Sequence, residues 1–367
     1  SLKAGSLKAG SLKAGSQEKT RYSKKRRKAA AMAHENTETH SYHTLPFPRI
    51  SCVILNYNDA ATVEKLVRKI CHYTVFRYII LVDNCSSDNS LTDLKKLAEE
   101  LNQKPELEFN QKPEMEFNQK LKKEFNQKSK KIIILSAKKN GGYGAGNNIG
   151  IRYSHDILHM DYVLIANPDV DFSEQLIIKL CRMFKHHPEL GTVSACMNDP
   201  VFGRQRNGWP LSDFWHELAR CGPLCRRIFN PFLEYPKRYF QGKKAVYVDA
   251  VHGSLLMVDA KKMIKCGGYD EGLFLYQEEA ILGSRMKNAG YRTALLLTDS
   301  YDHLHSTSIS RTYHNAWERQ KLRNKSCIYY YEKYLKINHM QKISAAVFFE
   351  IIHLEIWFCR KVLGMHL

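Results

Sequence analysis

The sequence lacks any uninterrupted run of about 18 apolar residues, so it predicts no transmembrane helix. It also lacks a secretory signal, because no apolar stretch follows the basic residues near its start. Acidic residues are few: 37 Asp and Glu stand against 56 Lys and Arg, and the formal net charge is +19. This excess favours an anionic partner such as nucleic acid, a membrane surface or a phosphate-rich ligand, with a solvated basic tail as the plainer alternative.

Paired metal-binding cysteine motifs are also missing, although the chain has 10 cysteines. The closest two, Cys221 and Cys225, are spaced C-x3-C, and no second pair completes a zinc site. Widely spread cysteines in a chain without a secretory signal are typical of free thiols in a reducing compartment. The sequence therefore predicts a cytoplasmic protein.

Composition divides the chain into three parts. Residues 1–48 combine a threefold Ser-Leu-Lys-Ala-Gly repeat, which we interpret as an added linker, with a flexible basic tail. Residues 49–305 have the texture of a folded domain, interrupted at 102–131 by a polar repeat that we interpret as a surface insertion. Residues 306–367 are predicted to form a C-terminal helical region.

Apolar runs and helical stripes alternate from residue 49 onward. The runs Ile50–Leu55 and Tyr78–Val82 are short and rich in β-branched residues, which predicts buried strands. Between them, four apolar residues recur at helical spacing: Val63, Leu66, Val67 and Ile70. Strand–helix alternation favours a parallel sheet. We therefore predict an α/β fold with a mostly parallel, Rossmann-like nucleotide-binding sheet flanked by helices and followed by a C-terminal helical extension.

Acidic residues directly follow two of the predicted strands. Asp83 follows Tyr78–Val82, and Asp169 and Asp171 follow the strand Tyr162–Ile165. Functional groups of parallel sheets gather at the carboxyl ends of strands, so we expect these carboxylates to share one site. Asp83 can accept a hydrogen bond from a base or ribose, with a turn-forming role as the alternative. Asp169 and Asp171 can ligate one Mn²⁺ or Mg²⁺ whose shell is completed by water and substrate phosphates.

A second acidic pair, Glu278 and Glu279, opens a predicted helix after an aromatic segment. A carboxylate in such surroundings suits a general base whose pKa is tuned by its environment. Complementation of the helix dipole is the alternative. His303 and His305 follow an extended run, and either can ligate the metal, bind phosphate or serve a purely structural role.

The glycine-rich segment Asn140–Gly150 lies between a predicted strand and a helix. It does not match the G-x-G-x-x-G dinucleotide motif in any register. We expect a flexible loop whose backbone approaches a diphosphate or sugar, with a tight turn as the alternative.

Several motifs follow one another in a characteristic order: VILNYN, ILVDNCSSDNS, NGGYGAGNNIG, YVLIANPDVDF and GSLLMVDAKKMIKCGGYDEGLFLYQEEAILGSRMKNAGY. Together with the later HLHSTS and LRNKSCIYYYEKY, they resemble glycosyltransferase family 2, particularly its rhamnosyltransferase-like branch. The resemblance covers about Ile50 to Leu335. It implies a GT-A catalytic domain at 49–305 and inverting, single-displacement transfer from a nucleoside-diphosphate sugar.

The resemblance also implies roles for the acidic residues and the histidine. Asp169 would bind the metal with help from Asp171, and His303 matches the family histidine. Members usually carry Glu-Asp where this chain has Glu278-Glu279, which places the base at Glu279 and leaves Glu278 as the alternative.

The same resemblance implies the substrate-binding residues. Gly253 and Ser254 would line the acceptor or sugar side. The nucleotide-sugar-binding set predicted in this way is Asn56, Tyr57, Asn58, Asp83, Asn84, Gly142, Tyr143, Asn147, Asn167 and Gly253.

The tail Ile343–Leu367 interleaves apolar residues with charged ones along a broad apolar face. It can pack against the catalytic domain or, in a homodimer, a second subunit. It can instead lie on an anionic membrane, which would make the protein peripheral on the inner face of the cell membrane.

The predicted function is metal-dependent transfer of a sugar, rhamnose by resemblance, from a dTDP- or UDP-sugar to a polysaccharide or lipid-linked glycan acceptor. A nucleic-acid partner is supported by charge alone. A catalytically inactive sugar-nucleotide-binding or scaffold protein is one alternative. A nucleotidyltransferase is another, but it needs a Lys- and Arg-rich loop early in the sheet, and Asn56–Asp59 contains neither residue.

Overall fold

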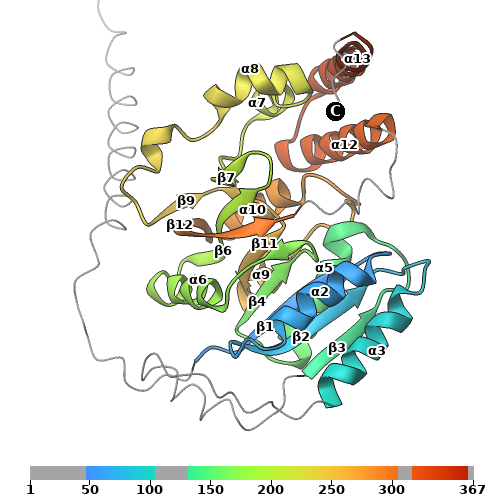
Figure 1. The fold of residues 1–367 in the computed structure, drawn as a ribbon. Coiled ribbons are helices and arrows are strands. Elements are labelled where there is room, and N and C mark those ends of the chain that lie inside the picture. The colour runs from blue at the N-terminus through green and yellow to red at the C-terminus, as the bar shows by residue number, and fades with distance from the viewer. Residues whose placement is uncertain (1–46, 104–130, 305–315, 363–367) are drawn as a thin grey trace, which may run out of the picture.

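The computed structural model describes residues 47–103, 131–304 and 316–362. The predictions for the basic tail, for most of the 102–131 repeat and for His305 therefore lie outside the described residues. Within the described part, a ten-stranded sheet organises the chain, and helices pack on both of its faces (Figure 1). The predicted α/β class is confirmed.

The sheet begins with four parallel strands in the order β3-β2-β1-β4. The inner strands β1 and β4 are apolar runs buried on both faces, as expected of parallel strands covered by helices. The bounds of the four are Ile50–Asn56 for β1, Phe76–Asp83 for β2, Lys131–Ser136 for β3 and Tyr162–Ala166 for β4.

Beyond β4 the sheet is mixed rather than mostly parallel. β11 runs antiparallel to both β4 and β6, and β12 then runs parallel to β6. An antiparallel strand starts at the edge where its parallel neighbours end, so the turn before β11 lies beside the carboxyl end of β4. The further strands are β5 (Val170–Asp171), β6 (Leu190–Asp199), β7 (Gly203–Gln205), β9 (Ala245–Val248), β11 (Leu255–Asp259) and β12 (Arg292–His303). A separate pair consists of β8 (Gly208–Trp209) and β10 (Ala250–Val251).

Helices α2, α3 and α6 cover one face of the sheet, and α5, α9 and α10 cover the other. The predicted stripe of α2 is buried against the sheet. Ser173 caps α6, because its hydroxyl accepts the N–H of Leu176 at 3.2 Å. The bounds are α2 Ala60–Ile70, α3 Ser90–Gln103, α5 Gly142–Arg152, α6 Glu174–His186, α9 Ala260–Lys265 and α10 Glu278–Asn288, with the π-helix η1 at Tyr153–Ile157.

The glycine-rich segment is part of helix α5 and not the flexible loop that the sequence predicted. Its glycines allow close packing: a Cβ at Gly146 would lie 2.4 Å from the side chain of Leu55, and one at Gly150 would lie 2.5 Å from Val53. At Gly142, φ is +85° and a Cβ would lie 1.9 Å from the carbonyl oxygen of Phe274. The helix therefore starts directly against the segment that precedes α10.

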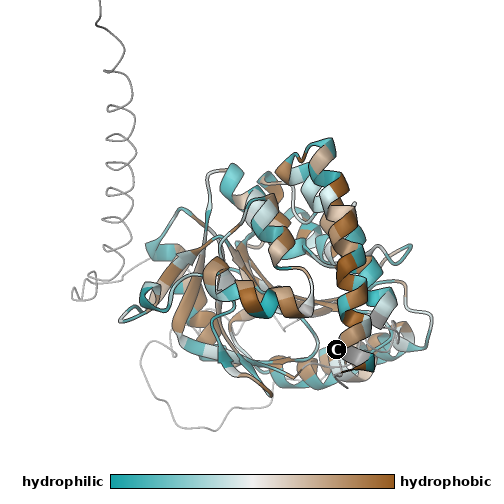
Figure 2. Cartoon of the chain, turned by 90° about the horizontal axis from the view of Figure 1, so that it is seen from above, coloured by the Kyte–Doolittle hydropathy of each residue, from teal (hydrophilic) through white to brown (hydrophobic). Residues whose placement is uncertain are grey.

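The segment 198–244 contains the helices α7 (Phe214–Ala219) and α8 (Pro223–Leu233) and the short η2 (Lys237–Tyr239). These helices join α12 (Ala316–Tyr330), η3 (Tyr331–Leu335) and α13 (His339–Lys361), so the predicted C-terminal helical extension is larger than expected. Figure 2 looks down on these helices. Their shared core includes Phe214, Tyr330, Tyr331, Phe349 and Ile352.

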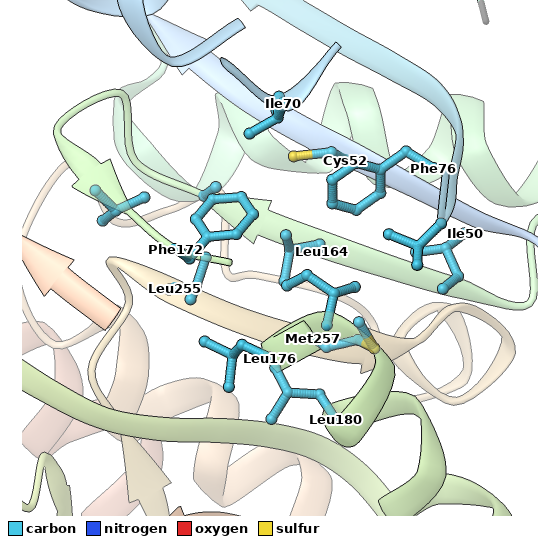
Figure 3. Packing of buried hydrophobic residues seen from close by; sticks show 14 of the residues in the cluster. Ile50, Cys52, Ile70, Phe76, Leu164, Phe172, Leu176, Leu180, Leu255 and Met257 are labelled. Atoms are coloured by element: carbon cyan, nitrogen blue, oxygen red, sulfur yellow. The ribbon is translucent and has the colours of Figure 1, made fainter. Parts of the chain in front are cut away.

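The largest core lies between the sheet and helices α2, α3 and α6. Figure 3 shows Phe76 and Phe172 packed among aliphatic side chains of the neighbouring strands and helices. The two rings meet edge to face with centroids 6.5 Å apart. Phe172 follows β5 directly, so this packing anchors the segment that carries Asp169 and Asp171.

Candidate active site

Asp83 and Asn56 occupy the last positions of two paired strands, β2 and β1, in direct register. Both side chains are buried, and the carboxylate of Asp83 accepts a hydrogen bond from Nδ2 of Asn56 at 2.9 Å. It also accepts from the hydroxyl of Ser86 at 2.6 Å and from its N–H at 3.1 Å. Three donors fix the orientation of this carboxylate at the strand edge.

Asn58 holds the loop after β1 against the loop after β2. It has a φ of +54°, its N–H donates to the hydroxyl of Ser86 at 3.0 Å, and its side-chain oxygen accepts the N–H of Ser87 at 2.8 Å. Tyr57, between Asn56 and Asn58, is half-buried. The predicted nucleotide-binding residues at this end of the sheet therefore lie together.

Two buried amides extend this region toward helix α5. Nδ2 of Asn84 donates to Oδ1 of Asn140 at 2.9 Å and to the carbonyl of Gly142 at 3.1 Å. Nδ2 of Asn147 donates to the carbonyl of Tyr143 at 3.1 Å. The Oδ1 atoms of both Asn84 and Asn147 are buried with no hydrogen-bond partner among the described residues. Such atoms suit the recognition of a ligand donor.

Gly253 lies at the centre of the site and joins α5 to α10. Its carbonyl accepts the hydroxyl of Tyr143 at 2.6 Å, and its N–H donates to Oε1 of Glu279 at 3.1 Å. Burial is the main cause that raises the pKa of Tyr143 well above its usual value, so this hydroxyl stays a donor. The start of α5, the turn before β11 and the start of α10 therefore meet at one point.

Glu278 differs from its neighbour Glu279. It is buried, and its Oε1 has no hydrogen-bond partner among the described residues. Burial, and after it the charge of Glu279, raises the pKa of Glu278 to about 8. At neutral pH Glu278 is therefore mostly protonated, whereas Glu279 is half-buried and held by the backbone of Gly253.

Asp169 faces His303 across two adjacent strands. The two side chains are buried, and Oδ2 of Asp169 lies 3.4 Å from Nε2 of His303. The ring of His303 lies 5.5 Å from the ring of His252, the residue before Gly253. Asp171, also predicted as a metal ligand, instead forms an ion pair with Lys69 of α2. Its role in metal binding stays a prediction.

Asn167 links the same strand edge to the turn before β11. Its N–H donates to the carbonyl of Ser254 at 2.8 Å. The hydroxyl of Ser254 lies 2.9 Å from Nδ1 of His252 and 2.8 Å from the hydroxyl of Tyr301. The sequence alone predicted no role for His252 or Tyr301, although His252 directly precedes the predicted Gly253.

The C-terminal helices position the segment that leads into Glu278. Tyr276 and Gln277 both have a φ of +70°, a strained conformation for residues other than glycine. Gln277 donates to Sγ of Cys327 at 3.3 Å, and the guanidinium of Arg323 lies 4.9 Å from the ring centre of Tyr276. Helix α12, through Arg323 and Cys327, therefore holds the strained turn in place.

A polar cluster around Asp270 fixes the same helices to the sheet domain. Its carboxylate accepts from the hydroxyls of Tyr329 at 2.9 Å and Tyr334 at 2.6 Å, and it lies 2.8 Å from Nζ of Lys333 and 3.3 Å from Arg285. Burial acts to raise the pKa of Asp270, but these donors outweigh it and hold the pKa well below its usual value.

The structure therefore brings most of the predicted residues to one edge of the sheet. A chain of contacts runs from Asp83 through Asn56, Asn84 and Gly142 to Tyr143 and Gly253. From Gly253 it continues to Glu279 on one side and, through His252 and His303, to Asp169 on the other. Such an arrangement offers acceptors for the N–H and hydroxyl groups of a ligand beside a carboxylate that can take up a proton.

No protein-family model matches the chain. It is 32% identical over 234 residues to the low-salt glycan biosynthesis hexosyltransferase Agl10 of Haloferax volcanii, covering 63% of this chain and 59% of the relative. It is 28% identical over 137 residues to an N-acetylglucosaminyl-diphospho-decaprenol L-rhamnosyltransferase of Mycobacterium tuberculosis, covering 36% of this chain and 43% of the relative. The chain thus spans about three fifths and two fifths of the lengths of these curated relatives.

Two solved structures have a similar fold. The mannosyltransferase PcManGT from Pyrobaculum calidifontis, in complex with GDP-Man and Mn²⁺, superposes with a TM-score of 0.50 at 12% identity, covering 91% of this chain and 81% of that one. GalNAc-T7 with UDP, GalNAc and Mn²⁺ superposes with a TM-score of 0.51 at 11% identity, covering 91% of this chain and 61% of that one. At this identity the likeness concerns the fold.

Proposed function

We propose that the chain is an inverting, metal-dependent sugar transferase. The premise is that it belongs with the family 2-like glycosyltransferases and has their GT-A fold. The observation that carries this proposal is the link through Gly253 between Glu279 and the edge of the sheet that holds Asp169 and Asp83. Single displacement needs a base and a bound diphosphate at the same place, and this edge would hold both.

The nucleotide of the donor would bind beside Asp83. Its fixed carboxylate and the open Oδ1 atoms of Asn84 and Asn147 are all acceptors, which match the N–H and hydroxyl donors of a base and ribose. The M. tuberculosis relative is named as a rhamnosyltransferase, which supports rhamnose as the transferred sugar. The donor we propose carries it on dTDP or UDP.

Asp169 and His303 fit a divalent cation. They offer one carboxylate and one imidazole within 3.4 Å of each other, a donor set that suits Mn²⁺ better than Mg²⁺. Within residues 47–103, 131–304 and 316–362, no group of three or more His, Cys, Asp and Glu side chains is arranged to hold a metal ion. The two residues would therefore share a bound cation with diphosphate oxygens and water. The positive charge of the cation would offset the negative charge of the departing diphosphate.

Glu279 would act as the base. It is the half-buried member of the acidic pair, and Glu278 beside it is mostly protonated near neutral pH. The acceptor hydroxyl loses its proton to Glu279 while its oxygen attacks the anomeric carbon. The bond from that carbon to the diphosphate oxygen breaks, and the nucleoside diphosphate leaves with the electron pair. Attack opposite the leaving group inverts the anomeric centre.

The acceptor would be a polysaccharide or a lipid-linked glycan, as the name of the M. tuberculosis relative suggests. We place the reaction in the cytoplasm, where sugar nucleotides and free thiols coexist. The thiols of Cys52 and Cys181 are buried, and burial raises their pKa values, so they are unreactive structural groups.

Ligand binding and turnover test the proposal separately. UDP or dTDP with Mn²⁺ should raise the melting temperature of the parent and of the control variant Asp88→Ala. In the parent, the Asp88 carboxylate accepts the N–H of Ser90 at 2.9 Å. Asp169→Ala should lose this rise. Equal turnover with Mn²⁺ and with a chelator would discard the metal role. Donor binding without transfer to any lipid-diphosphate acceptor would favour an inactive binding protein.

A further inference from the structure

Helices α8 and α13 form one continuous surface at the C-terminal side of the molecule. They lie side by side, since the N–H of Leu224 donates to Glu355 and a Cβ at Gly222 would lie 3.0 Å from Ile352 (Figure 1). We call their outward sides the α8–α13 face. It has no part in the catalytic arrangement described above.

Helix α13 is apolar on two sides. One stripe, consisting of Ala345, Phe349, Ile352 and Ile356, is buried against the other C-terminal helices. A second stripe follows helical spacing along the exposed side and comprises Met340, Ile343, Val347, Ile351, Leu354 and Phe358. Figure 2 shows the apolar residues along the helix that ends at the mark C. The buried stripe packs against the other C-terminal helices, and the exposed stripe is not covered by other described residues.

Helix α8 continues the apolar surface. Leu224, Ile228 and Phe232 recur every fourth residue on its exposed side, and 83% of Phe232 is exposed. Phe202, 76% exposed, lies with Arg226 and Arg227 around a hollow beside α8. Rows of exposed apolar side chains on two adjacent helices indicate a binding surface.

Cations surround these apolar residues. Arg226 and Arg227 are exposed on α8, with Glu234 beside them around the hollow, and Lys361 is exposed near the end of α13. Lys342, near the start of α13, is exposed but paired with Glu332. Glu355 is engaged with the N–H of Leu224, which leaves Glu350 as the exposed acid among the described side chains of the two helices. Apolar side chains rimmed by Arg and Lys are typical of helices that lie in the headgroup region of anionic membranes.

We propose that the α8–α13 face binds the surface of an anionic lipid bilayer, with its apolar residues inserted and its cations on lipid phosphates. No helix of the described residues has the length and apolar character to cross a bilayer, so α13 would lie along the surface. A second copy of the chain is a poorer occupant, because a two-fold interface sets the same cationic surface against itself. The net charge of +19 opposes such self-association.

Docking on this face would place the active site next to the membrane. Helix α12, which packs against α13, also holds Tyr276 through Arg323 at the entrance to the Glu278–Glu279 pair. If the proposed function holds, a lipid-linked acceptor could reach Glu279 without leaving the bilayer. Membrane binding itself does not depend on that function and can be measured without any sugar.

Flotation of the full chain with vesicles tests the proposal directly. The parent should float with phosphatidylcholine–phosphatidylglycerol vesicles and stay behind with phosphatidylcholine alone, and added salt should weaken its binding. Ile228→Glu and Leu354→Glu should each reduce partitioning about tenfold or more. Arg226→Gln combined with Arg227→Gln should remove the preference for anionic vesicles. Ile157→Glu, which changes an equally exposed residue on η1, should bind as the parent does.

The result is judged on variants that keep the parent melting temperature. Equal binding of the parent and Leu354→Glu to anionic vesicles would overturn the proposal. So would a lipid-independent dimer that dissociates in Ile228→Glu and Leu354→Glu while the parent fails to float, because the face would then belong to a second copy. Failure of the nucleotide shift in the parent would instead count against the proposed function.

Discussion

The backbone N–H of Gly253 donates a hydrogen bond to Oε1 of Glu279 at 3.1 Å. The two residues are 26 positions apart, and the bond fixes the carboxylate beside the strand edge that carries Asp169 and His303. A Cβ at position 253 would lie 3.1 Å from the same oxygen and 3.3 Å from the hydroxyl of Tyr143. Glycine is therefore needed here for the close approach of a carboxylate.

Gly253→Ala should lower the rate of sugar transfer by about tenfold, because Glu279 must shift by a few tenths of an ångström to admit the methyl group. Nucleotide binding should change little, since Asp83 and Asn84 lie elsewhere in the site. The measurement is kcat beside the nucleotide-induced melting shift. Gly242→Ala is the control for lost stability alone: φ is +68° there, so alanine is strained, but its Cβ meets nothing within 4 Å and kcat should stay at the parent value. If Gly253→Ala kept the parent kcat, the glycine would not be needed to position the base.

Glu279→Gln should reduce kcat by about 10²–10⁴-fold while donor binding persists, because the amide cannot accept the acceptor proton. Glu278→Gln should keep most of the activity, because it replaces a mostly protonated carboxyl group with a neutral amide of the same shape. Single-turnover transfer with both variants makes the comparison. The reverse order of the two losses would assign the base to Glu278.

The strand ends were predictable because their signals are local. Apolar runs followed by Asp83, and by Asp169 and Asp171, indicated where buried strands stop, and parallel pairing brings such ends to one edge. In the structure Asp83 and Asn56 meet at that edge. The cap at Ser173 is equally local, because it depends on the adjacent turn alone.

Other features depend on contacts between distant residues, which a single sequence does not display. Gly146 and Gly150 suggest a flexible loop by composition, yet they are helical because Leu55 and Val53 pack against them. The ion pair of Lys69 with Asp171 joins residues 102 positions apart. Helix α8 was missed because Pro231 and nearby aromatics lie within it. One signal was present in the sequence: Leu224, Ile228 and Phe232 recur every fourth residue.

Asp270→Asn should destabilise the protein by about 3 kcal/mol, because it leaves Arg285 and Lys333 without their shared charge partner. The pKa of Asp270 is depressed, so its contribution is present above the usual pKa of an aspartate and is lost as pH falls below it. Urea unfolding at neutral pH measures the loss. Asp93→Asn, at an exposed ion pair with Lys96, is the control and should change stability by less than about 1 kcal/mol. Equal stability of the two variants would contradict the anchoring role of Asp270.

Glu278 should make the protein less stable as pH rises. Its pKa is about 8 in the folded chain against an ordinary 4.5, so between these values the folded state holds a proton that the unfolded state has released. Stability therefore falls with pH across that window and levels off above about pH 8. Glu278→Gln should remove much of this slope and be more stable than the parent at about pH 8, with little difference at about pH 5. Urea unfolding over this pH range measures the effect. Glu217→Gln is a second variant: the pKa of Glu217 is raised to about 7, so its window ends at about that pH. An unchanged slope in Glu278→Gln would show that this carboxyl group is ionised in the folded chain.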